Sequence, residues 1–167
     1  MSHDPLATYL NDHLAGSVMA IGLMESLEEA YGDSPSTREI ANMVRDVRHE
    51  VEEDRDVLER LMTRAGTSES SIRKTAGWFA ERFAQAKMDA DDSGDGAFRL
   101  LESTEVVALG ILGKRGLWRA LQTATDLIPA TRGMNFDALI ARAEFQHERM
   151  DIIRLGAARA ALGDTAK

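Results

Sequence analysis

The chain has 167 residues, of which 44% are hydrophobic and 29% charged, and this size and composition predict one soluble globular domain over residues 1–167. Its net charge of −8, with no basic cluster, argues against a nucleic-acid partner, and the lack of cysteine excludes disulfides, thiol catalysis, zinc fingers and iron–sulfur clusters. No apolar run approaches the roughly 20 residues that span a bilayer, and the start of the chain lacks the features of a signal peptide, so we expect a cytoplasmic protein without a membrane partner.

The first two predicted helices cover about residues 5–31 and 36–65. Asp4 is placed to cap the first of them and Pro5 suits its first turn, while Gly32 and Pro35 favour its end. In both segments apolar residues recur at spacings of three and four, which is the pattern of a helix with one buried face. The short link between the two segments predicts an antiparallel hairpin.

Three further helices are predicted at about residues 70–88, 97–127 and 136–162. The first of these is long enough, at about 1.5 Å per residue, to carry the chain back along its neighbours as a crossover, and the last two form a second hairpin. Gly110, Gly113 and Gly116 lie inside the 97–127 helix. Because each interior glycine costs about 1 kcal/mol, they predict a close backbone approach there. The predicted fold is therefore all-α: an antiparallel four-helix bundle with a long helical crossover between its second and third helices, which is the ferritin-like arrangement.

Over about residues 5–162 the chain resembles the ferritin-like superfamily. It is similar in particular to a bacterial branch that has no assigned activity, through residues 9–16 (YLNDHLAG), residues 113–115 (GKR) and residues 118–121 (WRAL). This resemblance implies a four-helix bundle and, as candidate chemistry, a di-iron or di-manganese centre.

Candidate metal ligands are acidic residues and histidines three apart on a helix, because this spacing turns both side chains the same way. Glu144 and His147 match the Glu-x-x-His pattern of ferritin-like di-iron proteins, and Asp46 and His49 match it with Asp in place of Glu. The other two helices of the predicted bundle offer the carboxylates of Glu25, Glu28, Glu102 and Glu105.

The heights of these residues along the bundle argue against a complete di-metal centre. In the ferritin-like order, Glu102 and Glu105 lie roughly ten residues, or about 15 Å, from His147, whereas a ligand lies within about 2.2 Å of its metal. At the level of His147, the 97–127 helix offers a cation instead. We expect a buried layer of ion pairs and hydrogen bonds there, made of His13, Asp54, Lys114, Arg115, Glu144 and His147. Leaving one member of such a layer unpaired costs about 3–5 kcal/mol, which predicts that Arg115→Leu is strongly destabilising.

Two functions follow from these alternatives. The first is a non-catalytic ferritin-like bundle without cofactor, which acts by forming a homodimer or by binding a partner protein. The second is a di-iron or di-manganese carboxylate protein that acts as an oxidase, a peroxide scavenger or an iron store. A site for a single metal ion, using His13, Asp54, Glu144 and His147, is a third interpretation.

Overall fold

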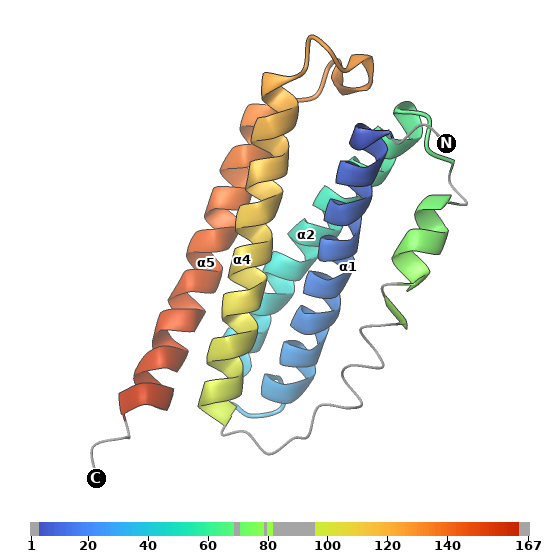
Figure 1. The fold of residues 1–167 in the computed structure, drawn as a ribbon. Helices are drawn as coiled ribbons and strands as arrows, with labels where there is room; N and C mark the ends of the chain where they lie inside the picture. The colour runs from blue at the N-terminus through green and yellow to red at the C-terminus, as the bar shows by residue number, and fades with distance from the viewer. Residues whose placement is uncertain (1–3, 69–70, 79, 82–95, 164–167) are drawn as a thin grey trace.

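A computed structural model describes residues 4–68, 71–78, 80–81 and 96–163, and this part of the chain is helical apart from turns and links. Four long helices lie side by side (Figure 1). Their bounds are α1 (Pro5–Tyr31), α2 (Arg38–Arg64), α4 (Gly96–Thr123) and α5 (Phe136–Gly163), with a short 3₁₀ turn at Pro129–Thr131. The prediction of an all-α fold is confirmed.

The four helices form two antiparallel hairpins, α1 with α2 and α4 with α5 (Figure 1). The α4–α5 hairpin packs against the α1–α2 hairpin through contacts of α1 with α4 and of α2 with α5. Helices α2 and α4 run in the same direction, so the link between them starts at one end of the bundle and finishes at the other (Figure 1). Residues 71–78 of this link are helical, and Ile72 is buried against the core. The rest of the crossover predicted at 70–88 lies largely outside the described residues.

The ends of the helices follow from local chemistry. Asp4 accepts hydrogen bonds from the backbone N–H groups of Leu6 and Ala7 at the start of α1, as its position predicts. Helix α2 ends before Gly66, whose φ of 93° lies in the left-handed region that glycine adopts without strain. Helix α4 ends at Thr123, four residues before the predicted boundary.

Core residues on α2, α4 and α5 follow a spacing of alternating three and four residues, the pattern of left-handed helix packing. In α5 the buried positions are Phe136, Leu139, Ala143, Gln146, Met150, Ile153 and Ala157. Two apolar clusters result, one containing Val51, Ile111 and Met150 and the other Leu58, Trp118 and Leu139. Polar residues occupy the level between them.

The prediction of a close backbone approach at the glycines of α4 is wrong. A Cβ atom built on Gly110 would lie 4.0 Å from the Cβ of Ala20, which is ordinary van der Waals contact. Around Gly113 and Gly116 no described atom beyond the local backbone of the helix lies within 4 Å of that position. These two glycines therefore weaken the helix without serving the packing of the described residues.

Candidate functional site

The polar level between the two apolar clusters is organised around Asp54 of α2, whose side chain is only 1% exposed. The ammonium group of Lys114 on α4 lies 2.5 Å from Asp54 Oδ2. Gln146 of α5 completes a triangle, because its Nε2 donates to Asp54 Oδ2 at 3.2 Å and its Oε1 accepts from Lys114 Nζ at 2.5 Å. Each of the three residues occupies a core position of its helix, so the sequence patterns of three helices bring them together.

Two arginines of α5 pair with carboxylates of α2 at or near the level of this triangle. Arg142 donates to Asp54 Oδ1 and, at 3.0 Å, to Glu53 Oε2. Two turns further along, Arg149 lies 2.5 Å from Glu50 Oε2. The buried carboxylate therefore meets two cations, Lys114 from within the core and Arg142 from its edge.

Burial governs the electrostatics of Lys114, whose side chain is only 12% exposed. Removal from water lowers the pKa of its ammonium group, and the nearby Asp54 carboxylate opposes this shift by attraction and hydrogen bonding. Arg142 adds to the lowering, since a second positive charge disfavours the first. The contact with Asp54 thus stabilises the buried ammonium group of Lys114.

A cavity of about 30 Å³ adjoins the layer on the side of α1, where Gly16 and Ser17 leave space. This volume holds one or two water molecules. Among its lining residues is Trp118, whose indole N–H is buried and has no hydrogen-bond partner among the described residues. The lining thus offers a water molecule both a donor and, in Asp54, an acceptor.

His13 also lines this cavity, and its ring meets that of Tyr9 edge-on with centroids 4.7 Å apart. Burial lowers the pKa of His13 below its ordinary 6.5, and the charge of Asp12 opposes the shift. The structure therefore places His13 beside Asp54 and Lys114 around one cavity.

Three residues expected in the buried layer lie at its periphery instead. Arg115 and Glu144 form an ion pair at 3.6 Å, but their side chains are 35% and 51% exposed, and His147 is half-buried. Gln146, which the apolar spacing allowed on the inward face as the alternative to His147 but which was left out of the predicted layer, is fully buried at this level. The spacing of Ala143, Gln146 and Met150 was the signal for it, because a core face that includes 143 and 150 passes through 146 and turns 147 aside. Arg142, also missed, lies one turn before Gln146 and reaches the same carboxylate.

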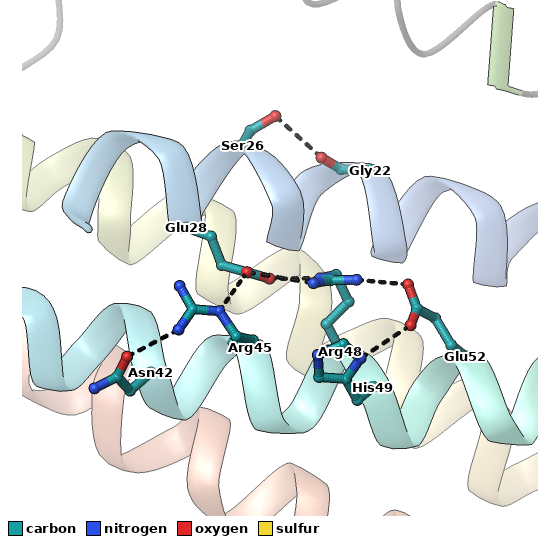
Figure 2. Close-up of polar contacts among 8 residues, drawn as sticks. All are labelled: Gly22, Ser26, Glu28, Asn42, Arg45, Arg48, His49 and Glu52. Carbon is teal, nitrogen blue, oxygen red and sulfur yellow. Dashed lines mark hydrogen bonds and ion pairs between the residues drawn. The ribbon is translucent and has the colours of Figure 1, made fainter. Parts of the chain in front are cut away.

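The candidate metal ligands of α1 and α2 are not assembled either. Asp46 and His49 are both exposed, and the His49 ring pairs with Glu52 at 3.3 Å. Figure 2 shows Glu28 of α1 between two arginines of α2, Arg48 at 2.5 Å and Arg45 at 3.2 Å. The hydrogen bonds that Arg48 donates to Glu28 raise the pKa of Arg48. The Glu28 carboxylate therefore neutralises two arginines.

Across the described residues, no three His, Asp or Glu side chains gather closely enough to hold a metal ion. In the same part of the chain, no helix has the length and apolar character needed to cross a membrane. Comparison with protein-family models, curated proteins and solved structures finds no match to this chain.

Proposed function

We propose that the chain is a ferritin-like four-helix bundle that catalyses no reaction, and that it acts by associating with itself or with a partner protein. In this proposal a layer of Asp54, Lys114 and Gln146 stands where ferritin-like enzymes hold their metals. The observation that carries the proposal is the hydrogen bond of the Lys114 ammonium to the buried carboxylate of Asp54 at 2.5 Å.

The proposal draws support from charge. A carboxylate that binds a metal offers its oxygen lone pairs to a dication, but Asp54 already accepts from Lys114, Arg142 and Gln146. A dication at this level would be repelled by two cations that lie within hydrogen-bond distance of the same carboxylate. The ammonium group supplies inside the protein the positive charge that a metal would otherwise supply.

The order of the helices supports the ferritin-like part of the proposal. A ferritin-like chain has two antiparallel hairpins and one long connection, which makes its second and third bundle helices parallel. Helices α2 and α4 run in the same direction in Figure 1. The helical residues 71–78 lie in the connection between them.

The test is elemental mass spectrometry on untagged protein, purified from medium supplemented with iron and manganese and then loaded anaerobically with ferrous ion. We expect far less than one metal atom per chain. Lys114→Met is the matched comparison, since it removes the buried cation and keeps the side-chain length. About two iron or manganese atoms per wild-type chain would overturn the proposal and favour a di-metal oxidase, peroxide scavenger or iron store.

A further inference from the structure

The outward face of α5 carries an apolar stripe that is largely exposed. Phe145, Ile152, Leu155 and Leu162 are 51–63% exposed, although each is a large apolar residue. Together with Glu148 and Arg159, which are also exposed, they occupy positions 145, 148, 152, 155, 159 and 162. This is the alternation of three and four residues that defines a seam between two helices.

The stripe lies on the solvent side of α5. The core face of this helix includes Gln146 and Met150, and positions 148 and 155 lie nearly opposite it at about 100° per residue. Helix α5 lies at one edge of the four helices, with α2 and α4 as its neighbours (Figure 1). A second helix therefore has room to lie along the stripe.

The order of residues along the stripe is self-complementary when two copies run antiparallel. Phe145 then faces Leu162 of the partner subunit, and Ile152 faces Leu155 of the partner subunit. Glu148 faces Arg159 of the partner subunit, and the twofold axis repeats each contact. In a parallel pair, by contrast, Glu148 would face its own copy, and like charges directly opposed are destabilising. The charges therefore favour a second copy of this chain, in the antiparallel orientation.

We infer that two copies of the chain form a twofold-symmetric dimer through an antiparallel pair of α5 helices, with Glu148–Arg159 ion pairs between apolar contacts. Gly156 lies near the middle of the stripe's length, and beyond the local helix backbone no described atom is within 4 Å of where its Cβ would be, so a second helix can approach closely. This inference names the partner in the self-association proposed above, but it rests on different residues.

The length of the stripe limits the area that the dimer can bury. From position 145 to position 162 it covers about 26 Å of helix. Eight half-exposed apolar side chains and two ion pairs bury on the order of 1,000 Å², the lower end for a specific interface. We therefore expect roughly micromolar dissociation and a monomer–dimer equilibrium that depends on concentration.

Sedimentation equilibrium over about 1 to 100 µM protein tests this inference through a charge exchange. Glu148→Arg and Arg159→Glu each place like charges opposite one another twice per dimer, so we expect each to weaken dimerisation at least about tenfold. The double variant restores opposite charges and is expected to return within about threefold of the wild type. Ile152→Glu should abolish the dimer, and helicity measured by circular dichroism checks that each variant is folded.

A wild-type chain that stays monomeric over this range would overturn the inference, as would a dimer that both single variants leave intact or that the double variant fails to restore. The metal measurement separates this outcome from failure of the proposed function. A metal-free monomer removes only the dimer and leaves partner binding, whereas a dimer that binds two iron atoms per chain removes the proposed function and keeps the interface.

Discussion

Replacing Asp54 by Asn removes the carboxylate that compensates the buried charge of Lys114, while the shape of the side chain is kept. Asp54 is 1% exposed and accepts hydrogen bonds from Lys114, Arg142 and Gln146. The variant leaves the ammonium group buried without its counter-charge, which costs about 3–5 kcal/mol. Since domains of this size are stable by about 5–15 kcal/mol, the loss is a large fraction of the free energy of unfolding.

Two further variants identify which interaction causes that loss of stability. In Lys114→Met the carboxylate keeps Arg142 and Gln146, so we expect a smaller cost of about 1–3 kcal/mol. Arg115→Leu, which the sequence predicted to be strongly destabilising, should cost less than about 1 kcal/mol, because the Arg115–Glu144 pair is exposed at 3.6 Å. Urea unfolding followed by circular dichroism, with equal m values, measures all three. A loss below about 1 kcal/mol for Asp54→Asn, or an equal loss for Arg115→Leu, would refute the reasoning.

Three other predictions concern residues outside this triangle. Because the pKa of His13 is lowered in the folded state, the unfolded chain takes up this proton first as pH falls below 6.5, and the free energy of unfolding decreases there. In urea titrations, the free energy of unfolding of His13→Gln should therefore decrease less between pH 7 and 5 than that of the wild type. Gly113→Ala and Gly116→Ala should each raise the free energy of unfolding by about 0.5–1 kcal/mol, since open space surrounds both positions. Gly66→Ala, at a φ of 93°, should lower it instead, and thermal unfolding compares the three. Glu28→Gln weakens the contacts to Arg48 and Arg45 and should lower the free energy of unfolding by about 1–3 kcal/mol in the same assay. An unchanged midpoint would mean that the two ion pairs of Glu28 contribute nothing to stability.

The helices were predictable because their signals are local. Apolar spacing, the Asp4 cap and the glycine after α2 place the ends of α1 and α2 within a few residues. The sequence also placed Asp54 at the same height as Lys114 and Arg115, since helix lengths set heights, but it did not decide which of the two cations faces Asp54. Heights are set by 1.5 Å per residue, so an error of one or two positions still leaves them at the same level.

Rotation about a helix axis is less forgiving than height. Adjacent residues differ by about 100° around the axis, so a one-residue error exchanges a core position for one beside it. Glu144 and His147 form a familiar metal-binding pattern, and for that reason the predicted layer included His147, although the spacing allowed either His147 or Gln146 on the inward face. The bonds that settle the rotation, from Gln146 and Arg142 to Asp54, join residues roughly 90 positions apart, and no local pattern encodes them.

The position of the Asp54 layer between two apolar clusters has a consequence for how the helices find their alignment. A helix with repeating core positions can slide by seven residues and still set apolar side chains against apolar side chains over most of its length. Such a slip would move Lys114 about 10 Å along its neighbours, so that Lys114 and Asp54 would both be buried without contacting each other. Because an unpaired buried charge costs about 3–5 kcal/mol, the misaligned arrangement is less stable than the native one. The polar layer of Asp54, Lys114 and Gln146 thus specifies the axial alignment of helices whose apolar core positions are largely repetitive.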